Sequence, residues 1–320
     1  MRKRAIIIGG SGQDGIEMAI FLKKKNYELI SIIRKKNNKI KKILNNKNIF
    51  KIADLQNTQK IIKIIKKFKP REIYNFAGIS TISESRNKIL LNDKVNSHAF
   101  LAILENLKKM KFKGKIFQSL SAEVFGDYNY KKINPQRFNP INPYAISKLS
   151  SYYYSKYFRK NFGLKIYCGF FFNHDSKYNK GANVIYYVIN NFKKILLKKK
   201  KSFSIRNVNV RRDWNLATVF IEKIWQILQK KKPCDFILRS GKYDYLEDIV
   251  FKVAQFYKIP MKIIVKNNKI IFINPKTKKP IIYSKRIKEK FENDTLNILD
   301  FKIGKKNKIL NIVKNIDSYL

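Results

Sequence analysis

Residues 5–15 read AIIIGGSGQDG, an apolar run that leads directly into a glycine-rich turn, and a helical pattern of apolar residues follows. Strand, glycine turn and helix form the context that a dinucleotide-binding fingerprint requires. Gly9 permits a tight turn, Gly12 lets the backbone approach a pyrophosphate, and Gly15 allows close helix packing beside a phosphate-facing helix N-terminus. We therefore predict a dinucleotide site here; the alternative is a tight turn without a ligand.

The end of the predicted second strand, 27–34, indicates which dinucleotide binds. An NAD-preferring site places an acid roughly 20 residues beyond the glycines to hold the ribose 2′-hydroxyl. This chain has Arg34 there, followed by Lys35 and Lys36. Two or three cations suit a 2′-phosphate, so we predict NADP as the cofactor. The alternative is a solvated basic loop.

Predicted strands and helices alternate through the first half at intervals typical of βαβ units. We predict an α/β fold: a Rossmann-type doubly wound parallel sheet with a smaller, mixed α/β C-terminal substrate domain. The NADP-binding domain is assigned to residues 1–172, with 207–232 returning to it. The substrate-binding domain is assigned to 173–206 and 233–320. The predicted strands of the first half are 5–8, 27–34, 49–53, 71–76, 115–120 and 164–172.

Motif residues follow all six predicted strands of this half. They are Gly9, Arg34, Asp54, Gly78, Ser121 and Asn173. Ligands of such sheets bind at the carboxyl ends of the strands, so we expect these residues to converge. Asp54, with Leu55, is expected near the adenine. Ala77 and Gly78 are small enough for the backbone to run close to the ribose or nicotinamide.

Tyr144 and Lys148 lie four residues apart in a predicted helix that begins at Pro143, so they share one face. A phenol has an ordinary pKa of roughly 10, and a nearby ammonium lowers it. We therefore expect this pair to move a proton at neutral pH. The alternative is a packed tyrosine beside a solvated lysine, in a chain that is rich in both.

Basic residues dominate the charge: 70 Lys and Arg face 22 Asp and Glu, a formal net charge of +48. Only 12 of the 70 are arginine, and the lysines are spread along the whole chain. Because base-reading arginines and a recognisable binding module are absent, we expect no specific nucleic-acid partner. The charge still favours anionic small molecules and nonspecific polyanion binding at low salt.

Composition also bounds the class of protein. No apolar run approaches the roughly 18–20 residues that a membrane span needs, so no membrane association is expected. Only four apolar residues precede Gly9, too few for a signal-peptide core, and we expect a cytoplasmic protein. Cys168 and Cys234 lack metal-ligand spacing, so no metal is predicted.

Five segments together carry a family likeness: 9–15 (GGSGQDG), 119–126 (SLSAEVFG), 143–148 (PYAISK), 172–176 (FNHDS) and 212–214 (RDW). On these segments the sequence resembles the extended short-chain dehydrogenase/reductases, and most closely the GDP-mannose 4,6-dehydratases among them. The likeness spans residues 4 to about 260. The Tyr-x-x-x-Lys pair marks only the superfamily, whereas Gly-Gln-Asp-Gly and Phe-Asn-His-acid-Ser are specific to the dehydratases.

The resemblance implies roles for four catalytic residues. Tyr144 and Lys148 would handle the proton of the sugar 4-hydroxyl as hydride leaves C4 for NADP, and Lys148 would also hold the nicotinamide ribose. Ser121 would hydrogen-bond the 4-oxygen. Glu123 would take the C5 proton and help expel the C6 hydroxyl as water. A carboxylate is a competent base there, because a C4 ketone acidifies the C5 proton.

The resemblance also implies a nucleotide-diphosphate sugar as substrate, with Asn173 and Arg212 at the diphosphate. We add Ser80 to the expected substrate contacts, and Gln13 and Asp14 to the cofactor contacts. Family members form dimers or tetramers, so a homodimer or homotetramer is expected.

The chain departs from the family pattern at four places. Ser121 stands where the family usually has threonine, and Ala122 replaces a small polar residue. Residues 79–83 differ from the usual polar and basic run, and 177–181 lack an expected arginine pair beside the nucleotide.

Two other functions stay open at this point. A related nucleotide-sugar epimerase or 4-ketoreductase would use Tyr144 and Lys148 but would not need Glu123. A non-catalytic protein that binds NADP or polyanions would need none of the three.

Overall fold

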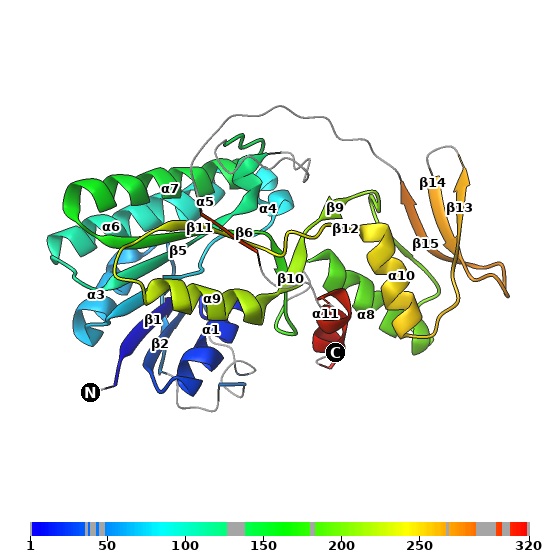
Figure 1. Ribbon diagram of the computed structural model, residues 1–320, viewed down its shortest axis with the longest axis horizontal. Coiled ribbons are helices and arrows are strands. Elements are labelled where there is room, and N and C mark those ends of the chain that lie inside the picture. Colours follow the sequence, from blue (N-terminus) through cyan, green and yellow to red (C-terminus); the bar gives the residue numbers. More distant parts are fainter. Residues whose placement is uncertain are drawn as a thin grey trace.

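The computed structural model describes residues 2–35, 38, 43–44, 49–126, 138–179, 183–266, 269–285, 299–302 and 308–318. Within these ranges the chain forms one large parallel sheet covered by helices on both faces, and a smaller mixed part toward the C-terminus (Figure 1). Lys36 and residues 180–181, which were named above, lie outside the described residues.

The main sheet has eight strands among the described residues, in the order β16-β11-β6-β5-β4-β1-β2-β3. They are β1 (Arg4–Ile8), β2 (Glu28–Ile33), β3 (Ile49–Ile52), β4 (Glu72–Asn75), β5 (Lys115–Ser121), β6 (Lys165–Phe171), β11 (Asp235–Arg239) and β16 (Leu299–Lys302). Every neighbouring pair is parallel. The predicted doubly wound α/β fold is therefore confirmed, and its six predicted strands lie within one or two residues of the observed ones.

Successive side chains of each buried strand point to opposite faces of the sheet, and each face packs against its own layer of helices. On β1, Ile6 and Ile8 face a core formed with α3 (Thr58–Phe68), α6 (Ala99–Lys109) and α7 (Pro143–Phe162). Ala5 and Ile7 face the opposite core with α1 (Gln13–Lys24) and α9 (Ala217–Leu228). Figure 1 shows the two layers on either side of the sheet. Strands buried on both faces explain why these segments read as apolar runs.

The helices begin and end where the sequence supplies capping residues. Asn142 accepts a hydrogen bond from the backbone N–H of Ala145 at 2.9 Å, Pro143 occupies the first turn, and Gly163 ends α7 in the left-handed conformation. Asn57 caps α3 in the same way, through the N–H of Lys60. Asn142 and Pro143 fix the start of α7, and so they fix the direction in which its first turn presents Tyr144.

The region before β5 is not one regular helix. It contains α4 (Ile82–Asn87), α5 (Ile89–Asp93), the π-helical turn η1 (Lys94–His98) and α6. Within η1, the Asn96 side chain donates to the carbonyl of Ile79 and accepts from its N–H, at 3.0 and 2.8 Å. The wide turn thus places a buried amide that holds the loop after β4, a use typical of π-bulges near functional sites.

The smaller part of the chain has its own core. It comprises α8 (Val184–Leu196), α10 (Leu246–Phe256), α11 (Lys308–Asp317) and a sheet of order β13-β14-β15-β8. Its strands are β8 (Phe203–Ser204), β13 (Lys262–Lys266), β14 (Lys269–Ile273) and β15 (Pro280–Lys285). Two short pairs link the parts: β7 (Asn173–Asp175) with β10 (Trp214–Leu216), and β9 (Arg211–Arg212) with β12 (Asp244–Tyr245).

The predicted domain boundaries stay a prediction. Two strands from segment 233–320, which was assigned to the substrate-binding domain, lie in the main sheet, namely β11 and β16. Strand β11 pairs directly with β6, so the chain returns to the main sheet after α9.

Candidate active site

Two adjoining cavities lie at the carboxyl ends of the main-sheet strands. The first, of about 380 Å³, is lined by Gly9, Arg34 and Asp54, among others. The second, of about 570 Å³, is lined by Ser121, Tyr144 and others. Both are lined by Gly12, Phe76, Gly78, Ile79 and Ser80. Because β1 and β4 are neighbours although β2 and β3 intervene in sequence, this is the switch point where such sheets bind ligands.

The glycine turn has the geometry that a dinucleotide needs. Gly9 has φ +86°, and a Cβ there would lie 2.7 Å from the backbone nitrogen of Ala77. A Cβ on Gly15 would lie 2.3 Å from the carbonyl oxygen of Gly9, whereas one on Gly12 would meet nothing closer than 3.4 Å. Gly12 lines both cavities, and as the N-cap residue of α1 it has no side chain that could accept from the first backbone N–H groups. The open backbone N–H groups therefore suit the pyrophosphate of a dinucleotide.

The first cavity brings together the residues predicted for the adenosine half of the cofactor. Arg34, Asp54, Leu55 and Ala77 all line it. The Asp54 side chain accepts a hydrogen bond from the N–H of Gln56 at 2.9 Å, which fixes the turn after β3. The exposed Arg34 is the one lining cation here that comes from the end of β2. The donor set fits an adenine nucleotide, with a cation available for a 2′-phosphate.

The second cavity brings together the four predicted catalytic residues: Ser121, Glu123, Tyr144 and Lys148. Ser121 ends β5 and caps the short helix η2 (Ala122–Phe125), where it accepts from the N–H of Glu123 at 3.2 Å. The Asn142 side chain donates to Glu123 at 3.4 Å. The residue that caps α7 therefore also orients the carboxylate.

The phenol of Tyr144 is buried beside Ser121 and Glu123. Burial raises the pKa of Tyr144 well above its ordinary value; a hydrogen bond with Ser121 lowers it, and the Glu123 carboxylate raises it. The Lys148 Nζ lies 5.9 Å from the centre of the Tyr144 ring. The expectation that the ammonium lowers the phenol pKa is therefore wrong for this structure, because desolvation outweighs the favourable interactions.

Lys148 is buried, with its Nζ donating to the carbonyl of Ser119 at 3.0 Å. Burial lowers the pKa of Lys148 to about 8, although the Asp14 carboxylate raises it. A lysine in this range exchanges its proton near neutral pH, as acid–base catalysis requires. The sequence predicted the position of Lys148 in the cavity but not the role of Asp14 as its counter-charge.

His174 lies in segment 172–176, and the sequence alone predicts no role for its side chain. Its Nε2 lies 2.9 Å from Oδ1 of Asp14, and its Nδ1 lies 2.8 Å from the carbonyl oxygen of Phe172. Both partners are acceptors, so both ring nitrogens must carry hydrogen, and the imidazole is cationic. Burial lowers the pKa of His174, but Asp14 and the two hydrogen bonds outweigh this and raise it to about 9.

The Asp14–His174 pair joins two of the motifs that carried the family likeness. Burial raises the pKa of Asp14, but His174 and the hydrogen bonds from His174 and Gln13 bring it below its ordinary value. Gln13 also donates to the carbonyl of His174 and accepts from the N–H of Ser176, at 3.1 and 2.9 Å. The glycine turn and segment 172–176 are therefore one hydrogen-bonded unit, a contact between distant segments that spacing alone could not reveal.

The three predicted substrate contacts are placed differently. Ser80 and Asn173 line the second cavity. Arg212 lines neither cavity; it lies half-buried on β9 and donates to the carbonyl of Arg211 at 3.0 Å. Its predicted contact with the diphosphate stays a prediction.

Among the described residues, no group of three or more His, Cys, Asp or Glu side chains is placed to hold a metal ion. No helix in the described ranges has both the length and the apolar character of a membrane span.

Comparison with known sequences gives a consistent family. A family model described as GDP-mannose 4,6 dehydratase matches residues 6–308. The chain is 30% identical over 268 residues to GDP-mannose 4,6 dehydratase of Cricetulus griseus, which covers 78% of this chain and 71% of that protein, and equally to that of Homo sapiens. It is 29% identical over 255 residues to GDP-mannose 4,6 dehydratase 1 of Arabidopsis thaliana, which covers 75% of this chain and 70% of that protein.

Comparison with solved structures gives the same fold at lower identity. UDP-glucose 4-epimerase of Thermotoga maritima, with UDP-glucose, matches with a TM-score of 0.78 at 17% identity, covering 99% of this chain and 98% of that one. dTDP-glucose 4,6-dehydratase of Bacillus anthracis, in complex with NAD, matches with a TM-score of 0.77 at 17% identity, covering 99% of this chain and 97% of that one. RMD of Pseudomonas aeruginosa, complexed with NADPH, matches with a TM-score of 0.76 at 15% identity, covering 99% of this chain and 98% of that one.

Proposed function

The chain belongs to the GDP-mannose 4,6-dehydratase family, and we propose that it is an NADP-dependent lyase that converts GDP-mannose to GDP-4-keto-6-deoxymannose. Family membership supports nucleotide-sugar 4,6-dehydration. The observation that carries the proposal to this chain is the meeting of Ser121, Glu123, Tyr144 and Lys148 in one cavity beside the glycine turn. An epimerase would need the tyrosine and lysine, but it would have no use for a carboxylate at the end of β5.

The reaction needs a hydride carrier and a set of proton-transfer groups. A bound nicotinamide would accept hydride from C4 of the sugar and later return it to C6. The raised pKa of Tyr144 favours the protonated phenol, so Tyr144 would take the proton of the 4-hydroxyl only as the phenolate, which the positive charges of Lys148 and a bound nicotinamide would favour. Ser121 would donate a hydrogen bond to the 4-oxygen. Lys148, with a pKa of about 8, would supply positive charge beside the phenol and hold the cofactor ribose.

In this proposal Glu123 is the acid–base residue for the elimination of water. Once C4 is a ketone, the C5 proton is acidic enough for a carboxylate to remove. The same carboxyl would then give its proton to the departing C6 hydroxyl, so that one water leaves and the carboxylate is restored. When hydride returns to C6, C5 would take up a proton, and the proton that Tyr144 removed from the 4-hydroxyl balances it. The hydrogen bond from Asn142 at 3.4 Å supports a fixed orientation for this side chain.

NADP, rather than NAD, is proposed from the cation at the end of β2. Arg34 lines the first cavity together with Asp54 and Leu55, and the adenosine ribose would lie in this cavity. A guanidinium binds a 2′-phosphate through two hydrogen bonds. None of the described lining residues from the end of β2 is an acid that would prefer the 2′-hydroxyl.

Self-association is proposed from the exposed face of α7. Ile146, Tyr153 and Tyr157 are each about half exposed, and their spacing of seven and four residues places them on one helix face. Leu90, on the adjacent α5, is 87% exposed. A homodimer or homotetramer would cover this surface, and sedimentation equilibrium would then give two or four times the mass of the chain.

Product analysis tests the proposed reaction. The chain is incubated with NADP and, separately, with GDP-mannose and other nucleotide sugars, and the products are identified by mass spectrometry. We expect GDP-mannose to lose one water and form a 4-keto-6-deoxy sugar. A stereoisomer of unchanged mass would instead indicate an epimerase. A thermal-shift series across GDP-, CDP-, UDP- and dTDP-sugars would identify the base, because a bound ligand raises apparent stability.

A further inference from the structure

A third cavity lies at the opposite edge of the main sheet from the candidate active site. It has a volume of about 800 Å³, and we refer to its fifteen lining residues as the basic cavity. Four cations come from the starts of main-sheet strands: Lys3, Arg71, Lys115 and Lys165. Four more come from the ends of α3 and α6: Lys66, Lys69, Lys111 and Lys113.

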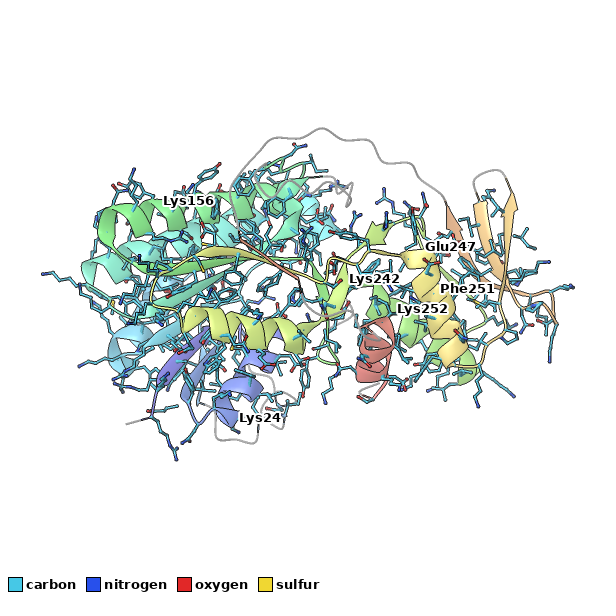
Figure 2. All side chains as sticks on the ribbon, in the orientation of Figure 1. Lys24, Lys156, Lys242, Glu247, Phe251 and Lys252 are labelled. Atoms are coloured by element: carbon cyan, nitrogen blue, oxygen red, sulfur yellow. The ribbon has the colours of Figure 1, made fainter. Side chains whose placement is uncertain are left out.

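The clustering exceeds what a lysine-rich composition provides. Eight of the fifteen lining residues are cations, against 70 of 320 in the chain, so the density is more than doubled. Elsewhere lysines extend from widely separated elements, as Figure 2 shows for Lys24, Lys156 and Lys252. In sequence the eight cations occupy four separate places, 3, 66–71, 111–115 and 165, and the fold brings these places together.

Helix ends explain some of these cations but not all. Lysine near a helix C-terminus is favourable, because it opposes the negative end of the helix dipole. This accounts for Lys66 on α3. It does not account for Lys115 and Lys165, which are direct register partners on β5 and β6. Like charges in opposed strand positions are destabilising, so this arrangement is not explained by stability.

Counter-charge within the basic cavity is largely absent. Its only acidic residue is Glu72, which is buried and accepts hydrogen bonds from Tyr27, Tyr74 and Gln229, at 3.1, 2.8 and 3.2 Å. In the described ranges, none of the eight cations forms an ion pair with a carboxylate. The cavity therefore presents concentrated positive charge that a bound anion would neutralise.

Lys115 shows the mutual repulsion directly. Its ammonium donates to the carbonyls of Leu228 and Lys230, at 2.7 and 3.1 Å, so it is held in place. Burial lowers the pKa of Lys115; Glu72 raises it, and Lys165 and Lys3 lower it further. A multivalent anion nearby would relieve this repulsion.

We propose that the basic cavity is a binding site for a small anion that carries several phosphate groups. Its volume lies within the roughly 300–1,000 Å³ of small-molecule sites, whereas a nucleic-acid surface would need a continuous basic stripe. The site is separate from the candidate active site, because it lies at the amino ends of the strands, and it does not depend on the proposed dehydratase activity.

Isothermal titration calorimetry with inorganic tripolyphosphate, at about 0.15 M salt, tests this site. The test variant is Lys66→Gln/Lys113→Gln; both lysines are exposed and have no hydrogen-bond partner among the described residues. The matched control is Lys199→Gln/Lys201→Gln, in the exposed turn after α8, which removes the same charge. We expect a single binding event, weakened about tenfold or more by the test variant and less than about twofold by the control.

Three results would overturn the proposal: no tripolyphosphate binding by the parent chain, equal weakening in both variants, or no weakening in the test variant. Equal weakening would mean that the whole basic surface, rather than this cavity, attracts the anion. Hydrogen–deuterium exchange with tripolyphosphate present locates the site independently. We expect added protection at 66–71 and 111–115, and protection only around the glycine turn would contradict the assignment.

Discussion

The two edges of the main sheet use charge in opposite ways. At the carboxyl edge Lys148 is buried, and Asp14 and His174 are partly buried. All three interact with opposite charges and have shifted pKa values. At the amino edge, the cations of the basic cavity are mostly exposed and have no ion-pair partners among the described residues. Groups that are paired with an opposite charge away from solvent can move protons, whereas exposed cations without an ion-pair partner can only attract anions. The net charge of +48 is a property of the whole chain and does not indicate how the two edges differ.

The largest difference between the edges should appear in turnover. Glu123→Gln keeps the shape of the side chain but removes the base, so we expect kcat to fall about 10³-fold, within the usual range for a general acid–base group. Product formation from GDP-mannose measures it. Glu105→Gln, an exposed acid on α6, is the control and should leave kcat unchanged. Full activity in Glu123→Gln would remove the case for a dehydratase.

The glycine turn should show the next largest effect, in stability. We expect Gly15→Ala to lower the free energy of unfolding by about 2–4 kcal/mol, because its Cβ would meet the backbone of Gly9 at 2.3 Å. Gly12→Ala should cost under about 1 kcal/mol, since its nearest contact is 3.4 Å, but it should weaken NADP binding. Urea denaturation and calorimetry measure the two effects. Equal losses of stability would contradict the assigned roles.

His174 should make stability depend on pH at the carboxyl edge. Its folded pKa of about 9 lies above its ordinary value of 6.5. Its stabilising contribution is therefore fully present below pH 6.5 and is lost as pH rises through about 9. We expect the parent chain to lose about 3 kcal/mol more than His174→Asn across this window. Denaturation curves at several pH values check this, and parallel curves would show that the ion pair is not stabilising.

Arg34 should give the smallest effect, in cofactor choice. Arg34→Ser should weaken NADP binding about tenfold, or about 1.4 kcal/mol, and leave NAD binding nearly unchanged. Lys35→Ser is the control, because Lys35 is equally exposed but does not line the first cavity. Equal losses for both cofactors would show that Arg34 does not contact the 2′-phosphate.

Contiguous motifs explain why the carboxyl edge could be predicted. The glycine turn, Arg34, Asp54, Ser121 and Tyr144 each stand directly after a strand or in the first turn of a helix, so chain order and one topological rule bring them together. The strand boundaries followed from apolar runs and the helix starts from capping residues.

Contacts between distant segments explain what could not be predicted. The Asp14–His174 pair joins residues 160 positions apart, and the raised pKa of Tyr144 depends on burial that only the packed structure defines. The return of β11 to the sheet depends on pairing with β6. The basic cavity was missed because its cations come from four strand starts and two helix ends, and lysines spread along a sequence look the same whether or not they converge.

Isotope tracing tests the central claim, that hydride leaves and returns within one sugar while water is lost. GDP-mannose carrying deuterium at C4 is incubated with the chain and NADP, and the position of deuterium in the product is read by NMR. We predict a 4-keto-6-deoxy sugar with deuterium at C6. A product without deuterium at C6, or one that keeps both the C6 hydroxyl and the original mass, would contradict the account.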